Sequence, residues 1–153
     1  MRKRKRVLVC GVFDFLHAGH LDFFSQAKAF GKKLVVLIAR DSNVAKAKGR
    51  KPFFSERERA RMVGALSIVD EVVLGDARDF VRGVLKAKTG VLVLGYDQRK
   101  SALPMLGLKA SASAREIKGF FKMKGLKLKV IVLKKGFKPR LFKSSKIRAR
   151  LGL

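Results

Sequence analysis

Several residue types are scarce or absent in this chain of 153 residues, and each absence narrows what the protein can be. There is no tryptophan, and a single cysteine, Cys10, excludes an internal disulfide framework and suits a reducing compartment. No apolar run is long enough to span a bilayer, and no apolar signal-peptide stretch follows the charged start. We therefore expect a cytoplasmic protein with no membrane segment.

Acidic residues are also scarce, which makes the chain extremely basic. Eleven Asp and Glu stand against 37 Lys and Arg, so the formal net charge is +26. After Asp97 the only acidic residue is Glu116, whereas seventeen Lys and Arg lie between Arg99 and Arg150. Residues 1–6 form a basic N-terminal arm. Such a field attracts nucleotides and nucleic acid, but no motif for specific nucleic-acid recognition accompanies it, and a solvated lysine-rich surface is the alternative.

The remaining residues, 7–153, suit one domain with a substantial core. Apolar runs alternate with amphipathic patterns along it. We expect strands at 7–12, 34–39, 70–74, 91–94 and 126–133, and helices at 19–30, 55–66, 77–88, 113–124 and 144–151. Residues 42–52 are expected to form a loop, and 99–112 are left unassigned. This alternation predicts an α/β fold: one Rossmann-like domain with an open, mostly parallel five-stranded sheet and helices on both faces.

The most informative stretch follows the first expected strand and contains His17-Ala18-Gly19-His20. The N-terminus of a helix exposes unpaired N–H groups and a partial positive charge, so anions bind there readily. Imidazoles placed there donate hydrogen bonds to phosphate oxygens. Zinc would require three or four ligands, and the chain offers only these two histidines and Cys10 on an expected buried strand. The motif therefore predicts a polyphosphate site and no metal site of its own.

Four blocks of sequence together resemble the cytidylyltransferase-like nucleotidyltransferases. The first is Gly11-Val12-Phe13-Asp14 followed by the two histidines, and the others are 41–52, 95–98 and 143–147. They occur in the family's order and cover nearly the whole chain from about Arg6. Within this family the pattern is most similar to the archaeal FAD synthases, with the glycerol-3-phosphate cytidylyltransferases as near relatives.

The resemblance implies roles for particular residues. His17 and His20 would contact the α- and β-phosphates. Lys46 would stabilise charge at the reaction centre, and Lys48 is the second candidate for this role. We place both lysines on one side of an extended loop, where Lys48, like Arg59, would also help to bind the acceptor; a solvated arginine is the alternative for Arg59. The further nucleotide-binding residues would be Val12, Phe13, Ala18, Gly19, Gly95, Asp97, Ser144 and Ser145. Val12 departs from the family, where threonine is common. Asp14 is expected to stabilise the turn, and indirect help in holding a divalent cation is the alternative.

The implied reaction is the transfer of AMP from ATP to FMN, which yields FAD and pyrophosphate. A divalent cation such as Mg²⁺ would be bound with the nucleotide, and a homodimer is expected because relatives often dimerise. Two alternatives stay open: a cytidylyltransferase acting on glycerol 3-phosphate or a similar phosphorylated alcohol, and a non-catalytic basic protein that binds RNA or nucleotide.

Overall fold

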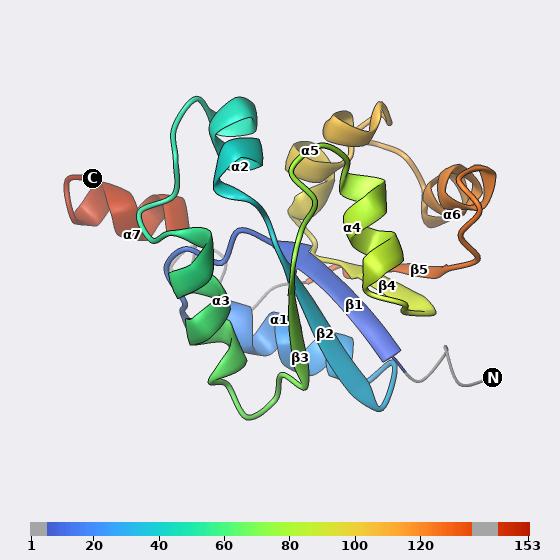
Figure 1. Ribbon diagram of the computed structural model, residues 1–153, viewed down its shortest axis with the longest axis horizontal. Helices are drawn as coiled ribbons and strands as arrows, with labels where there is room; N and C mark the ends of the chain where they lie inside the picture. The colour runs from blue at the N-terminus through green and yellow to red at the C-terminus, as the bar shows by residue number, and fades with distance from the viewer. Residues whose placement is uncertain (1–5, 136–143) are drawn as a thin grey trace.

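The structure is a computed structural model that describes residues 6–135 and 144–153. Its five strands form one sheet in the order β3-β2-β1-β4-β5, and every pairing is parallel (Figure 1). The strands are β1 (Arg6–Gly11), β2 (Lys33–Ile38), β3 (Glu71–Leu74), β4 (Val91–Leu94) and β5 (Lys129–Val132). The helices are α1 (Ala18–Lys28), α2 (Asp41–Lys48), α3 (Glu56–Gly64), α4 (Phe80–Lys86), α5 (Gln98–Ala102), α6 (Ala114–Met123) and α7 (Ser144–Arg150), with a 3₁₀ turn at Pro104–Leu106.

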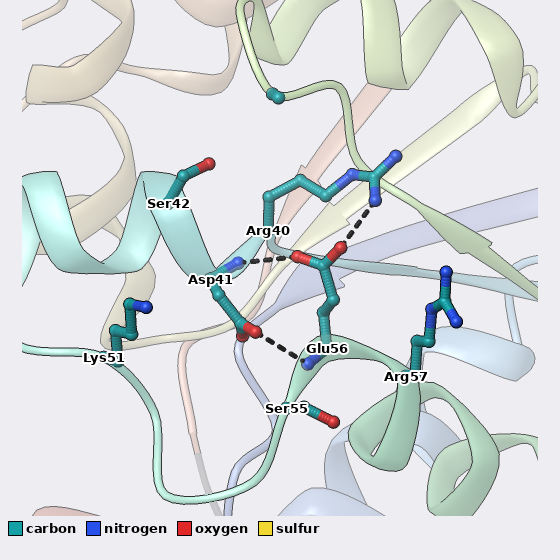
Figure 2. Close-up of a pocket in the computed structure, with 8 residues that line it drawn as sticks. Arg40, Asp41, Ser42, Lys51, Ser55, Glu56 and Arg57 are labelled. Carbon is teal, nitrogen blue, oxygen red and sulfur yellow. Dashed lines mark hydrogen bonds and ion pairs between the residues drawn. The ribbon is translucent and has the colours of Figure 1, made fainter.

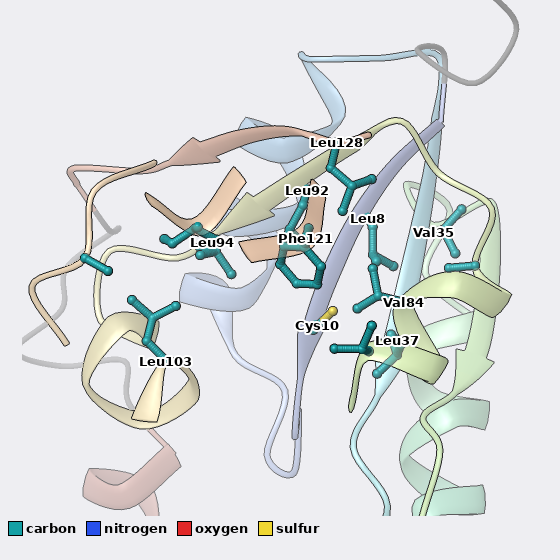
Figure 3. Close-up of a cluster of buried hydrophobic side chains, with 14 residues drawn as sticks. Leu8, Cys10, Val35, Leu37, Val84, Leu92, Leu94, Leu103, Phe121 and Leu128 are labelled. Atoms are coloured by element: carbon teal, nitrogen blue, oxygen red, sulfur yellow. The ribbon is translucent and has the colours of Figure 1, made fainter. Parts of the chain in front are cut away.

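The central strands are buried on both faces, as parallel strands covered by helices must be. Alternate residues of β1 point into two separate apolar clusters. Leu8 and Cys10 pack with α4 and α6, whose buried side chains include Val84 and Phe121 (Figure 3). Val7 and Val9 pack on the other face against residues of α1 and α3. Helices therefore cover both faces of the sheet, which confirms the predicted single α/β domain.

The order of the strands creates one switch point, between β1 and β4. From β1 the chain proceeds to β2 and β3 on one side, and then crosses to β4 and β5 on the other. The register of β1 with β4 pairs Val7 with Val91 and Leu8 with Leu92, close to the beginning of both strands. Ligands of such sheets bind beyond the carboxyl ends of the strands at this point. The histidine motif follows β1 at this edge of the sheet.

One expectation is wrong: residues 42–52 do not form a continuous loop, because α2 occupies Asp41–Lys48. Its Ala and Lys residues are good helix formers, and Gly49 ends the helix in a left-handed conformation with φ 71°. The unassigned segment 99–112 contains most of α5 and the 3₁₀ turn. Among the helices that the structure describes, none is long and apolar enough to cross a membrane. The basic arm lies outside the described residues except for Arg6, which begins β1.

Candidate functional site at the switch point

The two histidines cap α1 reciprocally. Nδ1 of His17 accepts a hydrogen bond from the backbone N–H of Gly19 at 3.1 Å. Nδ1 of His20 accepts from the backbone N–H of His17 at 3.3 Å. The two rings stack with centroids 3.9 Å apart. Each ring is thus held by its Nδ1 at the helix N-terminus, where a Ser or Thr followed by Glu or Gln forms the usual capping box.

This capping determines the protonation of both rings. A neutral imidazole that accepts through Nδ1 carries its proton on Nε2, so each histidine has an N–H donor on the opposite side of the ring. Burial and the neighbouring His17 lower the pKa of His20 to about 3. Burial lowers the pKa of His17 as well, although Asp97 acts to raise it. Both side chains are therefore neutral hydrogen-bond donors near neutral pH, and the positive field must come from other groups.

The turn between β1 and the histidines depends on two unusual residues. Phe13 has a positive φ of 52°, which is uncommon outside glycine and is characteristic of strained functional turns. Its buried ring lies edge-on to the rings of His20 and Phe24 and also covers Gly11. A Cβ at Gly11 would stand 2.6 Å from Cζ of Phe13, so the ring fits only above a glycine. Phe13 thus supports the motif from the core side.

Gln98 bridges the carboxyl ends of the two central strands. Its Oε1 accepts from the N–H of Gly95 at 2.7 Å, and its Nε2 donates to the carbonyl of Cys10. A Cβ at Gly95 would lie 3.4 Å from the Gln98 side chain. The adjacent Asp97 is exposed, and its charge acts on His17. The sequence predicted nucleotide contacts for Gly95 and Asp97 in this block, but it did not predict that Gln98 joins β4 to β1.

Asp14 ties the histidine turn to two other segments. Its buried carboxylate accepts from the backbone N–H groups of Phe53 and Phe54 at 2.7 and 2.9 Å. Arg148 of α7 forms an ion pair with it at 3.2 Å and lies over the ring of Phe15. The structural role expected for Asp14 is confirmed. Arg148 lies one residue beyond the block 143–147 and was not predicted, because only a folded chain brings α7 back to β1.

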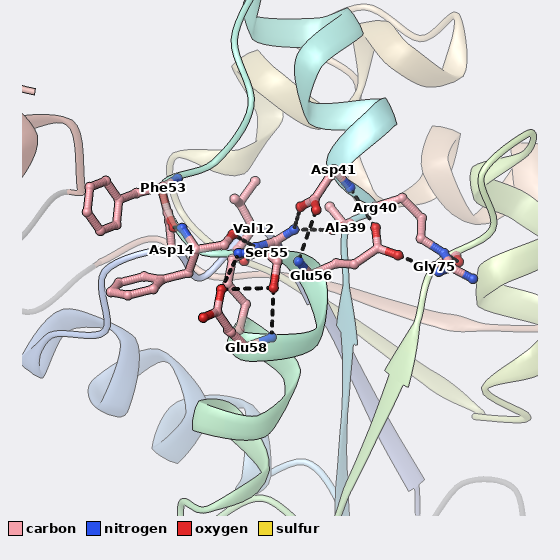
Figure 4. A network of polar contacts seen from close by, with 12 residues as sticks. Val12, Asp14, Ala39, Arg40, Asp41, Phe53, Ser55, Glu56, Glu58 and Gly75 are labelled. Atoms are coloured by element: carbon pink, nitrogen blue, oxygen red, sulfur yellow. Dashed lines mark hydrogen bonds and ion pairs between the residues drawn. The ribbon is translucent and has the colours of Figure 1, made fainter.

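Arg59 requires a correction, because its side chain has no exposed surface. The guanidinium donates to the carbonyls of Val12 at 2.6 Å, Ala39 at 2.8 Å and Phe54 at 3.1 Å, and it pairs with Asp41 at 2.7 Å (Figure 4). These contacts join the chain after β1, the chain after β2, the α2–α3 loop and the start of α2. Arg59 is therefore neither a solvated arginine nor an exposed donor for an acceptor phosphate.

The two loop lysines also separate, because they lie on a helix. Val44 is the buried residue of α2, and Lys48 follows it by four positions, on the same helix face. Lys46 lies two positions from Val44, about 200° around the helix axis, so it faces away from the core. The pKa of Lys48 is lowered mainly by burial and by Arg50, and its ammonium also interacts with Asp14 and Asp97. The two lysines therefore do not share one side.

A cavity of about 480 Å³ opens beside this network, at the carboxyl ends of β2 and β3 (Figure 2). Its lining is Arg40, Asp41, Ser42, Lys51, Ser55, Glu56, Arg57 and Ala77, which includes no residue predicted to bind nucleotide. Burial alone would raise the pKa of Glu56, but hydrogen bonds from the Asp41 N–H and Arg40 hold it below its ordinary value. The two carboxylates that line the cavity, those of Asp41 and Glu56, are thus already hydrogen-bonded within the protein. We therefore treat the cavity as a structural feature rather than a binding site.

The serine block at the start of α7 is described only in part. Ser145 is exposed on α7. The side chain of Ser144 and residue Lys143 lie outside the described part of the chain, so the contribution expected of them stays a prediction. The Asp14–Arg148 ion pair nevertheless joins α7 to the histidine turn.

Comparison with known proteins identifies this arrangement. The model of the cytidylyltransferase-like family matches residues 8–150, so the chain belongs to this family and is a nucleotidyltransferase. FAD synthases of Thermococcus sibiricus and Pyrococcus abyssi are each 37% identical to it, over 95% and 97% of this chain and 91% and 93% of theirs. The FAD synthase of Methanosarcina barkeri is 45% identical over 63% of this chain and 68% of its own. The predicted family is confirmed.

Solved structures agree with this assignment at the level of the fold. A Thermoplasma volcanium protein described as a lipopolysaccharide core biosynthesis protein superimposes with a TM-score of 0.72 and 30% identity, covering 87% of this chain and 98% of that one. The pantoate–β-alanine ligase of Francisella tularensis shares the fold with a TM-score of 0.58 and 14% identity, covering 98% of this chain and 70% of its own.

Proposed function

We propose that this protein is an FAD synthase that transfers AMP from ATP to the phosphate of FMN. Support comes from relatives of that name that match almost the whole chain. The observation that carries the proposal is the reciprocal capping of His17 and His20. It gives the turn after β1 two fixed Nε2–H donors, at the switch point where nucleotides bind in such sheets.

The reaction needs no covalent intermediate with the protein. An oxygen of the FMN phosphate attacks the α-phosphorus of ATP, the bond from that phosphorus to the bridging oxygen of the β-phosphate breaks, and pyrophosphate leaves. The neutral histidines would donate hydrogen bonds to α- and β-phosphate oxygens as negative charge shifts toward the leaving group. Because they are held at the helix N-terminus before the substrate arrives, little reorganisation is required.

We assign the cationic role at the reaction centre to Lys48 rather than Lys46. The support is that the exposed Lys48 lies on the same face of α2 as the buried Val44, and that its ammonium interacts with Asp14, Asp97 and Arg148. Lys46 faces away from the core, so its substitution serves as the control for that of Lys48. This choice departs from the sequence-based prediction, which preferred Lys46 on the assumption of an extended loop.

The remaining nucleotide contacts are proposed from the matching blocks of the family. Backbone groups of Val12, Phe13, Ala18 and Gly19 would face the phosphates, Gly95 and Asp97 would contact the nucleoside, and Ser144 and Ser145 would contact the terminal phosphates. The N–H of Gly19 already binds His17, so it is the weakest candidate of this set. Among the described residues, no group of three or more His, Cys, Asp and Glu side chains is arranged so that it could hold a metal ion.

A divalent cation would therefore be held largely by the triphosphate, with few protein carboxylates around it. Bound there, the cation would neutralise phosphate charge and polarise the α-phosphoryl group. A homodimer and a cytoplasmic location also stay predictions, and light scattering of the purified protein tests the first.

The substrate pair is tested by pyrophosphate release from the purified protein. ATP or CTP is combined with FMN or glycerol 3-phosphate in the presence of Mg²⁺, and the flavin product is identified by chromatography. We expect turnover with ATP and FMN alone. Turnover only with CTP and glycerol 3-phosphate would establish the alternative cytidylyltransferase, and no turnover with any pair would refute the enzyme assignment.

The assignment of the histidines is tested in the same assay. His17→Ala and His20→Ala should each lower kcat roughly 100- to 1000-fold, the usual effect of removing one donor from a developing anion. Circular dichroism verifies that the variants are folded. Full activity in either folded variant would remove that histidine from the site.

The two lysines provide a matched pair on one helix. Lys48→Gln should lower kcat at least about tenfold, because a cation near developing charge contributes more than about 1.4 kcal/mol. Lys46→Gln removes the same charge from the outward face of α2 and should change kcat less than about twofold. The reverse ranking would restore the sequence-based choice of Lys46.

A further inference from the structure

The ion pairs of the protein are distributed very unevenly. Six of them join described residues: Arg6–Glu71, Lys28–Asp70, Arg40–Glu56, Arg59–Asp41, Lys86–Asp76 and Arg148–Asp14. None of these uses a cation between Lys100 and Lys135, where ten lysines and arginines are all exposed. The one acidic residue of this segment, Glu116, accepts from the N–H of Ser113 at the start of α6. The positive charges between Lys100 and Lys135 therefore have almost no acidic partners within the same segment.

Helix α6 arranges three of these cations in a line. Arg115, Lys118 and Lys122 are exposed and spaced three and four residues apart, so they lie on one side of the helix, next to the side that carries the buried Ile117 and Phe121. They span about 10 Å of helix axis, so the three cations can contact neighbouring phosphates of one nucleic-acid strand. We call these three residues the α6 stripe.

Gly119 lies within the stripe without a structural reason for being glycine. A Cβ there would meet nothing within 4 Å, and glycine inside a helix costs about 1 kcal/mol relative to alanine. Its effect is to leave the helix surface low beside Arg115 and Lys122, which are four and three residues away, and this allows a phosphate strand to approach the backbone closely. Helix α6 lies at the opposite end of the molecule from α7, whose Arg148 pairs with Asp14 of the histidine turn (Figure 1).

We infer that the α6 stripe is a docking surface for the phosphodiester backbone of a nucleic-acid duplex. A membrane surface fits less well, because the apolar side of α6 is already packed in the core and is not available for insertion into lipid. Of the side chains described between residues 98 and 135, the only large apolar one that is exposed is Met123. No exposed aromatic ring is present there to stack unpaired bases, which favours a duplex over a single strand.

The test compares two triple variants of the full-length protein that remove equal charge from different places. The stripe variant is R115Q/K118Q/K122Q. The control is K32Q/R61Q/R82Q. These three cations are exposed, take part in none of the six ion pairs and precede Asp97, in the part of the chain that holds every acidic residue except Glu116. Binding to fluorescent RNA and DNA duplexes of one mixed sequence is measured by anisotropy over a series of salt concentrations.

We expect the stripe variant to bind at least about tenfold more weakly than the parent, with the slope of log K against log salt reduced by about 2.7, or 0.9 per lost contact. The control should stay within about threefold. Pyrophosphate release by both variants should equal that of the parent, because neither set touches the histidine turn. The two duplexes show whether RNA or DNA is preferred.

Three results would overturn the inference. Equal losses in the two variants would show that net charge acts without a located surface. Absence of measurable duplex binding by the parent at about 0.1 M salt would remove the ligand. Stripe-dependent binding to phosphatidylserine vesicles, with none to either duplex, would assign the surface to a membrane instead.

Discussion

At the residue scale, the site depends on how two histidines are held rather than on their charge. Each Nδ1 accepts a backbone N–H, which places the proton on Nε2 and resists protonation of the ring. A doubly protonated imidazole could not accept these bonds, so the capping arrangement and the low pKa of His20 have a shared structural basis. The family motif predicts the residues, whereas their neutrality follows from burial.

The low pKa of His20 makes the stability of the protein depend on pH. Its folded pKa of about 3 lies below the ordinary value of 6.5, so between these values the unfolded chain binds a proton that the folded chain does not. Stability contributed by neutral His20 is therefore complete above pH 6.5 and is lost as the pH falls. Between pH 7 and pH 5 we expect a loss of about 1–2 kcal/mol.

Urea unfolding at both pH values measures this loss. The variant His20→Gln cannot titrate in this range, so its stability should change by clearly less between pH 7 and pH 5. An equal change in the parent and the variant would show that another group titrates.

At the scale of elements, Arg59 organises the carboxyl edge of the sheet. Its guanidinium holds carbonyls that follow β1 and β2, and its partner Asp41 begins α2. The carboxylates of Asp41 and Glu56 also accept hydrogen bonds from each other's backbone N–H, so the first turns of α2 and α3 cap each other. The sequence predicted only a loop at residues 42–52 here, because these contacts join residues 15 or more positions apart.

Removing this buried cation should destabilise the whole domain. Arg59→Met leaves three carbonyls and Asp41 without their donor, and loss of one partner of a buried ion pair typically costs about 3–5 kcal/mol. The measurement is the free energy of unfolding in urea. Arg61→Met, an exposed change on the same helix, should cost less than about 0.5 kcal/mol. Similar losses in the two variants would refute the organising role of Arg59.

At the scale of the whole molecule, charge opposes folding. A formal net charge of +26 on 153 residues generates repulsion in the compact state, and the ion pairs near the surface compensate little of it. Salt screens repulsion between exposed charges over distances beyond about 8–10 Å. The protein should therefore be stabilised by salt, in contrast to a protein whose surface is dominated by ion pairs.

Calorimetry in increasing NaCl checks this expectation. Tm should rise by several degrees between low ionic strength and about 0.5 M, and the R115Q/K118Q/K122Q variant should start at a higher Tm and rise less. A fall of Tm with salt would show that attraction between paired charges dominates. A matching series in sucrose separates screening from the exclusion of cosolute.

The sequence by itself determined the α/β class, the expected positions of the five strands, the family and the histidine turn. These features rest on local patterns: apolar runs, alternation of strand and helix, and motifs in a fixed order. Only the tertiary structure decided that residues 41–48 form a helix, that Lys48 and Lys46 point apart, and that Arg59 is buried. It also brought Gln98 and Arg148 to the turn after β1. The contacts of Arg59, Gln98 and Arg148 depend on backbone groups and carboxylates from distant segments, which satisfy buried polar atoms only once the chain has folded.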